Sequence, residues 1–281
     1  MINKNFIIGG DPEFFCKNIE TDEYISLIPY IKGTKKKPQN IEVNGCSQLR
    51  DGVSIELNLP PVPKFWMLHN IISDCIDYTN DWLKNINPNY ILDITSSAVF
   101  DSTQLKHKEA RTFGCDPAYN CYTTDECYRP EPSSLNGLRT ASYHIHYGWE
   151  EEIDTDTLRK FIFLNDVFLG FPAIYLDHTD IKRKAVYGQL GEHRIKNPLL
   201  NYYDIKTSKR IEYRTLGAGI HNYPAFIENG IELIRDNIKN LDSFVELYYD
   251  DFTVMVLQPN DLDYKQYIKQ KLINNGHYNE Q

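Results

Sequence analysis

Apolar and polar residues alternate along three segments of the chain, as they do in strands with one covered face. In residues 51–59, positions 53, 55, 57 and 59 are apolar; in residues 141–149, positions 143, 145, 147 and 149 are aromatic or aliphatic. Residues 210–216 repeat the pattern with Ile211 and Tyr213. Since side chains two apart in a strand share a face, strands are predicted over all three segments. Such alternation favours an antiparallel sheet over a doubly wound parallel one.

A longer period predicts helices elsewhere. Between residues 63 and 85, apolar residues recur at three- and four-residue steps, and Pro88 follows, which indicates an amphipathic helix. Asp154 or Thr155 is expected to cap a helix that runs to about Gly170, and another helix is expected over 224–248. Further expectations are short strands at 6–8, 23–28 and 90–100, a loop or weak hairpin at 29–50, a long ordered loop at 101–138, and mixed structure at 176–209.

Length and charge narrow the class of protein. The 281 residues suit one large domain over 1–281, with a loop insertion near 101–138. The net charge of −9 argues against a nucleic-acid coat, and Lys35-Lys36-Lys37 is interpreted as a solvated loop. No apolar run approaches the ~18 residues that span a bilayer. The N-terminus enters a strand without a signal-like apolar stretch, which favours a cytoplasmic protein without membrane attachment.

The six cysteines are expected to be reduced thiols, because the chain is long and shows no secretory signal. Cys115, Cys121 and Cys127 are spaced evenly by six residues. This is not the spacing of a zinc-binding pair. A zinc site is therefore not expected there.

The polar faces of the predicted strands carry groups that bind metals or phosphates. A single Glu or Arg on a sheet face is usually just solvated, and a lone His-x-His pair is usually a satisfied polar pair. Acids and histidines gathered on one face would instead repel or desolvate each other unless cations neutralised them. Oxygen-rich ligation with an occasional imidazole suits Mg²⁺ or Mn²⁺, which in turn suits ATP. The residues concerned are Asp11, Glu13, Glu56, Asn58, His144, His146 and Glu212.

Arginines supply a second kind of group. Arg214 follows Glu212 by two residues, and Arg111, Arg139 and Arg194 each adjoin a motif-like segment. Guanidinium forks bind phosphates and carboxylates through two hydrogen bonds. No GxxxxGK[ST] run occurs, so phosphates would be held by metals and arginines rather than by a phosphate loop.

Five short motifs occur in order over residues 9–217, about three quarters of the chain. Together they resemble the phage-type (phiEco32-like) carboxylate–amine ligases of type 2, which belong to the glutamine synthetase and γ-glutamylcysteine synthetase superfamily. The motifs are Gly10-Asp11-Pro12-Glu13-Phe14, Asp51-Gly52-x-x-x-Glu56-Leu57-Asn58-x-Pro60-Pro61, Gly114-Cys115-Asp116-Pro117-x-x-Asn120, His144-Ile145-His146-x-Gly148 and Glu212-Tyr213-Arg214-x-Leu216.

The resemblance implies an α+β fold, a curved and mostly antiparallel sheet with helices on its outer face and ATP and metals on its inner face. It implies that ATP phosphorylates a carboxylate and that an amine then attacks the acyl phosphate to give an amide. It also implies metal ligands at Glu13 with Asp11, at Glu56 with Asn58, at His144 or His146, and at Glu212, and a phosphate clamp at Arg214. Catalytic roles are further predicted for Arg194 and Asp116, and substrate or nucleotide contacts for Asn58, Arg139, Arg111 and Asn120.

Several points stay open at this stage. The substrates are expected to be a small-molecule or peptide carboxylate and an amine, joined in a bacterial host cytoplasm if the chain is phage-encoded. The base that deprotonates the amine is unassigned, with Asp116 and Glu192 as guesses, and an oligomer is possible. One alternative is a metal-dependent hydrolase, although in barrel amidohydrolases the His-x-His pair comes early and βα repeats follow. Another is a non-catalytic binding or virion protein that retains the fold.

Overall fold

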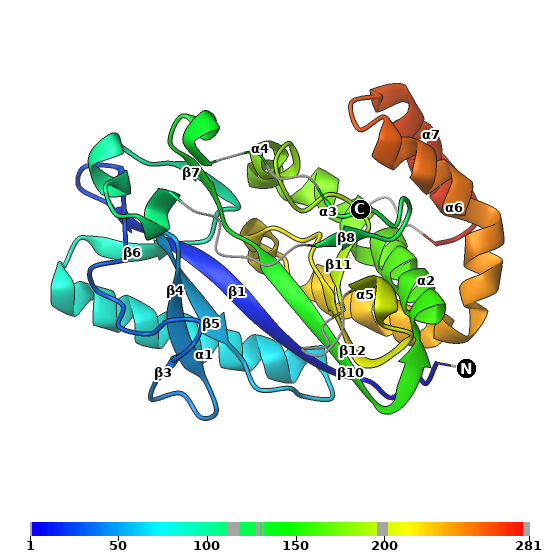
Figure 1. Cartoon of the computed structure of the whole chain (residues 1–281), viewed down its shortest axis with the longest axis horizontal. Coiled ribbons are helices and arrows are strands. Elements are labelled where there is room, and N and C mark those ends of the chain that lie inside the picture. Colours follow the sequence, from blue (N-terminus) through cyan, green and yellow to red (C-terminus); the bar gives the residue numbers. More distant parts are fainter. Residues whose placement is uncertain (1, 112–117, 128–129, 131, 196–201, 278–281) are drawn as a thin grey trace.

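A large antiparallel sheet organises the protein (Figure 1). The computed structural model describes residues 2–111, 118–127, 130, 132–195 and 202–277. Every strand pairing in this part of the chain is antiparallel, as the alternating pattern predicts. The strand order is β3 (Gln39–Asn40), β4 (Ser47–Asp51), β5 (Ser54–Asn58), β1 (Ile7–Asn18), β10 (Tyr143–Asp154), β12 (Thr207–Tyr213), β11 (Glu192–Arg194) and β8 (Tyr119–Asn120).

The first strand runs through the glycines at 9 and 10. The expected strand at residues 6–8 and the strand-like alternation expected after these glycines form one strand, β1, which continues to Asn18. Gly10 is needed for a close approach: a Cβ there would lie 2.9 Å from the Tyr143 ring and 3.0 Å from the His144 carbonyl oxygen. The far end of β1 pairs with β2 (Glu23–Ile25) and β6 (Tyr90–Asp93). A separate small sheet joins β7 (Ser97–Val99) to β9 (Leu138–Thr140).

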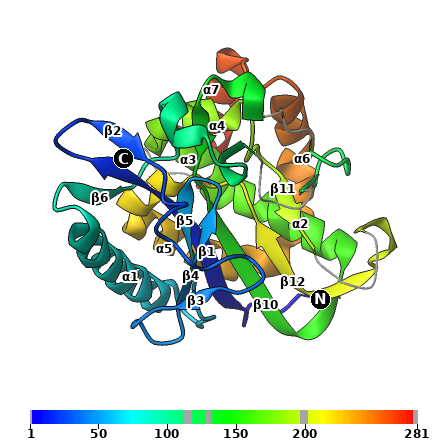
Figure 2. The same ribbon diagram turned by 60° about the vertical axis from the view of Figure 1, so that its left-hand side comes forward.

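Helices form a layer on one side of the sheet (Figure 2). Helix α1 (Phe65–Ile86) contacts β1 and β6, α2 (Thr155–Asn165) contacts β10 and β12, and α5 (Pro224–Asn237) lies against both helices. The apolar faces of the strands pack against these helices. The rings of Tyr147 and Phe161, for example, meet edge to face with their centroids 4.8 Å apart. Outside α2 lie α6 (Leu241–Leu257) and α7 (Leu262–Asn274).

The predicted helices are mostly confirmed, with two differences. Helix α1 matches the expected segment, and the Asp154 carboxylate caps α2 by accepting a 2.8 Å hydrogen bond from the Thr157 amide. The prediction of one helix over 224–248 is wrong: α5 ends at Asn237 and the 3₁₀ turn Ile238–Asn240 precedes α6. Helix α7 was not anticipated. In the described residues, no helix is both long and apolar enough to cross a bilayer.

A π-helical turn follows α2 and fixes the outer side of β12. The turn, Asp166–Gly170, leads into the short helix α3 (Phe171–Leu176). The buried Asp166 carboxylate accepts hydrogen bonds from the Tyr122 and Tyr213 hydroxyls, each 2.7 Å long. Burial raises the pKa of Asp166 to about 7. Gly170 leaves room for this contact, since a Cβ there would meet the Tyr213 hydroxyl at 2.2 Å.

The long segment at 101–138 contains more regular structure than a loop. It holds 3₁₀ turns at Ser102–Leu105, Glu109–Arg111 and Pro132–Leu135, and the edge strand β8. Hairpin β3–β4 confirms the weak hairpin expected within 29–50. Residues 114–117 of the third motif lie outside the described part of the chain. The five cysteines within it are free thiols, as expected, and Cys121 is buried.

Candidate metal centre

Strand register brings the predicted acids onto one face of the sheet. Strand β1 lies between β5 and β10, with Glu13 opposite Glu56 and Asp11 opposite His144. On the next strand over, Glu212 lies opposite His146. The polar faces of four separate segments therefore meet side by side. The sequence predicts that these side chains share one face, which the strand pairing confirms, whereas the pairing itself was not predicted.

One set, here called the acidic trio, consists of Glu13, Asp51 and Glu56. One carboxylate oxygen from each lies within 4.8 Å of the other two. Glu13 and Glu56 are buried, at 6% and 8% exposed. The Ser142 amide donates a 2.8 Å hydrogen bond to Glu13 Oε2. The lysines at 35–37 are exposed, as expected of a solvated loop. The Lys35 ammonium also lies 3.1 Å from Asp51 Oδ2, at the edge of this set.

The acidic trio is electrostatically costly by itself. Burial, followed by the charges of Asp51 and Asp11, raises the pKa of Glu13 to about 8. The same causes, with the charge of Glu13 added, raise the pKa of Glu56 well above its usual value. Without a cation, Glu13 therefore retains at neutral pH a proton that a carboxyl group normally loses. A divalent cation among these oxygens would replace the protons and remove the repulsion.

A second set, here called the mixed group, consists of Asp11, His144, His146 and Glu212. His144 Nδ1 lies 3.2 Å from Asp11 Oδ1 and 3.5 Å from Glu212 Oε1. His146 Nε2 lies 3.3 Å from Asp11 Oδ2. Ligand atoms of Asp11, His146 and Glu212 all lie within 4.8 Å of one another. Asp11, His146 and Glu212 thus converge, and His144 lies beside both acids.

Two arginines hold the Glu212 side of the mixed group. Arg194 donates to both Glu212 oxygens, at 2.7 and 2.8 Å, and Arg214 Nη1 forms an ion pair with the same carboxylate. Burial opposes ionisation of Glu212, but the Arg214 charge prevails and holds its pKa at about 2. The predicted proximity of Arg214 to Glu212 is confirmed, and Arg194 lies beside the same carboxylate.

The histidines of the mixed group differ in charge. Burial and the nearby Arg214 lower the pKa of His144 to about 4, so its imidazole is neutral at neutral pH. Burial also disfavours the charged form of His146, yet the Asp11 carboxylate raises its pKa above the usual value. Burial opposes the charge of Asp11 as well, but His146 and His144 hold its pKa well below the usual range. A neutral imidazole, as at His144, is the form that ligates metals.

Other predicted site residues lie elsewhere in the fold. The Arg139 guanidinium donates to the carbonyl oxygens of Ala110 and Leu138. Asn58 donates to Ser47 Oγ at 3.4 Å, and Glu192 accepts from the Gln189 amide at 3.0 Å. Asn120 donates to the Leu190 carbonyl and Arg111 to the Lys106 carbonyl. None of these side chains joins either set, and Asp116 lies outside the described residues.

Two residues of the site were missed by sequence reasoning. Asp51 seemed to begin the strand of Glu56, but Gly52, with a φ of +55°, turns the chain, so Asp51 ends β4 instead. Tyr187, whose hydroxyl lies 2.9 Å from His144 Nε2, comes from an irregular segment. The Asp51-Gly52 pair was a usable turn signal. For Tyr187 no pattern was available.

The donor sets fit hard divalent cations. The acidic trio offers only oxygen atoms, and the mixed group adds imidazole nitrogen, a combination that suits Mg²⁺ or Mn²⁺. The buried repulsion within the trio, relieved by a cation, is independent support for this fit. No protein-family model matches this chain, and no curated protein is similar to it in sequence.

Proposed function

We propose that the protein is an ATP-dependent carboxylate–amine ligase that forms an amide through an acyl phosphate, as the motif resemblance implies. One observation supports the proposal: a single strand, β1, supplies acids to both the acidic trio and the mixed group, and two arginines lie at the mixed group. In this proposal the acidic trio holds one Mg²⁺ or Mn²⁺, and the mixed group holds another. In this proposal the antiparallel sheet corresponds to the curved sheet that the resemblance to the glutamine synthetase superfamily implies.

The chain's own residues would serve the chemistry as follows. Bound divalent cations supply charge neutralisation for the ATP phosphates. Arg214 and Arg194 add fixed positive charge beside the transferring phosphoryl group. A substrate carboxylate oxygen forms a bond to the γ-phosphorus while the bond from that phosphorus to ADP breaks. An amine then attacks the acyl carbon, phosphate leaves, and the amine loses a proton to a base.

The alternatives make different demands on the fold. A barrel amidohydrolase has parallel strands alternating with helices, whereas every strand pair in the described chain is antiparallel. Buried acids outnumber imidazoles in the two sets, which favours oxygen-preferring cations over a zinc centre. A non-catalytic protein with the same fold would bind the cations and ATP but release no ADP.

The direct test is ADP release in the presence of Mg²⁺ and ATP across a panel of amino acids and peptides, with mass spectrometry of the products. We expect ADP and an amide to appear in equal amounts with the correct pair of substrates. Mg·ATP should also raise the melting temperature, because it binds the folded protein and not the unfolded chain. Binding without turnover over the whole panel favours the non-catalytic alternative, and absence of any binding refutes the proposal.

A matched pair of variants ties the activity to the site. Glu56→Gln removes a charged ligand while keeping shape, and Glu246→Gln makes the same change at an exposed position on α6. We expect Glu56→Gln to abolish turnover while the fold is retained, and Glu246→Gln to behave as wild type. The same loss is expected for Glu13→Ala and Glu212→Ala. Unfolding of all three site variants would show that these acids are structural.

A further inference from the structure

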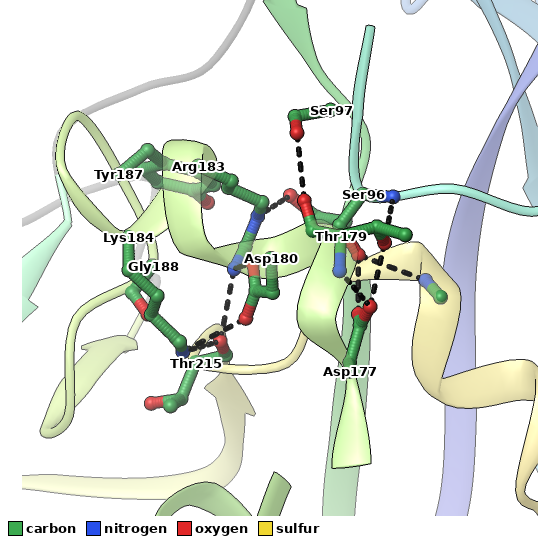
Figure 3. Close-up of polar contacts among 12 residues, drawn as sticks. Ser96, Ser97, Asp177, Thr179, Asp180, Arg183, Lys184, Tyr187, Gly188 and Thr215 are labelled. Atoms are coloured by element: carbon green, nitrogen blue, oxygen red, sulfur yellow. Dashed lines mark hydrogen bonds and ion pairs between the residues drawn. The ribbon is translucent and has the colours of Figure 1, made fainter. Parts of the chain in front are cut away.

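The segment after the short helix α4 (Ile181–Lys184), which carries Tyr187 and Gly188 in Figure 3, contacts the mixed group at His144. Its Tyr187 places the phenol oxygen 2.9 Å from His144 Nε2. The other nitrogen of the same ring, Nδ1, faces Asp11 and Glu212. Tyr187 thus occupies the side of the imidazole that points away from the acids.

Arg183 anchors this segment to residues next to β10 and β12, two of the three strands that carry the mixed group. The guanidinium is fully buried and donates to Asp180 Oδ1 and to the carbonyl oxygens of Thr215 and Arg214, each at 3.0 Å. It also donates to Ser142 Oγ at 3.1 Å. Figure 3 shows Arg183, Asp180 and Thr215 joined in this way. A segment with so many buried bonds to β10 and the end of β12 is held in a fixed position.

Gly188 leaves room for the Arg183 guanidinium. Gly188 has a φ of +73°, which disfavours other residues, and a Cβ there would come within 2.2 Å of Arg183 Nη1. The Tyr187 ring then lies between two guanidinium groups. Its centroid is 4.9 Å from Arg183 Cζ and 5.3 Å from Arg214 Cζ. Both distances suit cation–π attraction. Tyr187 therefore contacts a metal-facing histidine through its hydroxyl and the proposed phosphate clamp through its ring.

We propose that Tyr187 is a positioning residue that allows His144 to change tautomer when a cation binds and that keeps Arg214 in place. The inference rests on the proposed function. Without a cation, His144 Nδ1–H faces the Asp11 carboxylate and the Tyr187 O–H donates to Nε2. With a cation, the Nδ1 lone pair is needed for ligation, so the proton must be on Nε2, from which it is donated to the phenol oxygen.

A hydroxyl serves both states because it can donate and accept, whereas a carboxylate or carbonyl could only accept. The ring stays neutral throughout: one proton leaves Nδ1 for water and another reaches Nε2 from water. Partners on the far nitrogen of a metal-bound histidine fix its orientation, and their loss typically reduces metal affinity about 10- to 100-fold.

The test uses two substitutions at one position. Tyr187→Phe removes the hydroxyl and keeps the ring, while Tyr187→Leu removes both. Tyr24→Phe is the matched control. It also removes a hydroxyl that donates a hydrogen bond, 2.6 Å long and to Asp93, but at the end of the sheet where β2 and β6 pair with β1. Mn²⁺ affinity is measured by electron paramagnetic resonance, and the His144 tautomer by ¹⁵N NMR with and without Mg²⁺, assigned from the signals missing in His144→Asn.

For wild type we expect the Nδ1–H tautomer without Mg²⁺ and the Nε2–H tautomer with it. Tyr187→Phe should reduce Mn²⁺ affinity by about tenfold or more, and Tyr24→Phe should leave it unchanged. Tyr187→Leu should in addition reduce the rate of ADP release below that of Tyr187→Phe at saturating Mn²⁺. A wild type that binds no Mn²⁺ refutes the proposed function itself. Wild-type binding with no tautomer change, or with equal affinity in Tyr187→Phe, overturns this inference alone.

Discussion

Replacing Glu13 with glutamine should make the cation-free protein more stable at alkaline pH. The raised pKa of Glu13 means that the folded protein holds a proton there between about pH 4.5 and about pH 8, while the unfolded chain has released it. The contribution of this group to stability is therefore complete below pH 4.5 and is lost as the pH rises through 8. Glutamine imitates the protonated form, and it can still accept the Ser142 amide hydrogen bond.

The size of the effect follows from the shift. Each pKa unit corresponds to about 1.4 kcal/mol, so a rise from 4.5 to about 8 corresponds to at most about 5 kcal/mol. Most of this, about 4 kcal/mol at most, accumulates between about pH 5 and about pH 9. The charge of Glu13 also raises the pKa of Glu56, so these two groups titrate as a pair, which makes this figure an upper bound.

The assay is urea unfolding in EDTA at about pH 5 and about pH 9. It compares wild type, Glu13→Gln and the exposed control Glu246→Gln. We expect the wild type to lose free energy of unfolding relative to Glu13→Gln as the pH rises, and the control to follow the wild type. With Mg²⁺ present the order should reverse, because only the wild type has the full ligand set. If Glu13→Gln gains nothing at alkaline pH in EDTA, Glu13 is not a strained buried carboxylate and the electrostatic argument for the trio fails.

Three further predictions concern single side chains. Arg214→Lys should bind ATP with an affinity within about tenfold of wild type yet lose about a hundredfold in kcat, because a lysine lacks the planar fork beside the phosphoryl group. ATP titration measures the affinity, and the rate of ADP release measures kcat. An unchanged kcat would remove Arg214 from the catalytic residues. Lys35→Met should raise Mn²⁺ affinity up to about fivefold, since the ammonium near Asp51 competes with a cation; lower affinity would show that Lys35 supports the site. Asp154→Ala should reduce the free energy of unfolding by about 1 kcal/mol in urea titrations through loss of the α2 cap, and an unchanged value would contradict this role.

Alternation made the acids predictable as a set. The residues on either side of Glu56, His144, His146 and Glu212 are apolar, so these four had to share the uncovered side of their strands. Alternation does not predict which residues pair across neighbouring strands. That Glu13 lies opposite Glu56, and Glu212 opposite His146, depends on which backbone groups pair across the sheet.

Residue type was a weaker guide away from the strands. Arg139 and Asn120 are of residue types that often bind ligands, but both side chains donate hydrogen bonds to backbone carbonyl groups within the fold. A buried backbone group requires a partner, and a nearby long polar side chain can supply it as readily as a strand can. Tyr187 is the opposite case, because an irregular segment with no period brings it to His144 through contacts of Arg183 that are distant in sequence.

The Asp166 carboxylate joins parts of the chain that are far apart in sequence. Its two tyrosine partners come from the turn after β8 and from β12, while Asp166 itself begins the π turn after α2. If any of the three segments opened, it would leave a buried polar group in the others without its partner, which costs more than the bond itself is worth. We therefore expect these segments to open in a single step, so that their slowest amide protons exchange with solvent at a common rate. Glu212 and Arg214, which flank Tyr213, would then be lost from the site together with the tyrosine–aspartate contact and not by separate fraying of β12.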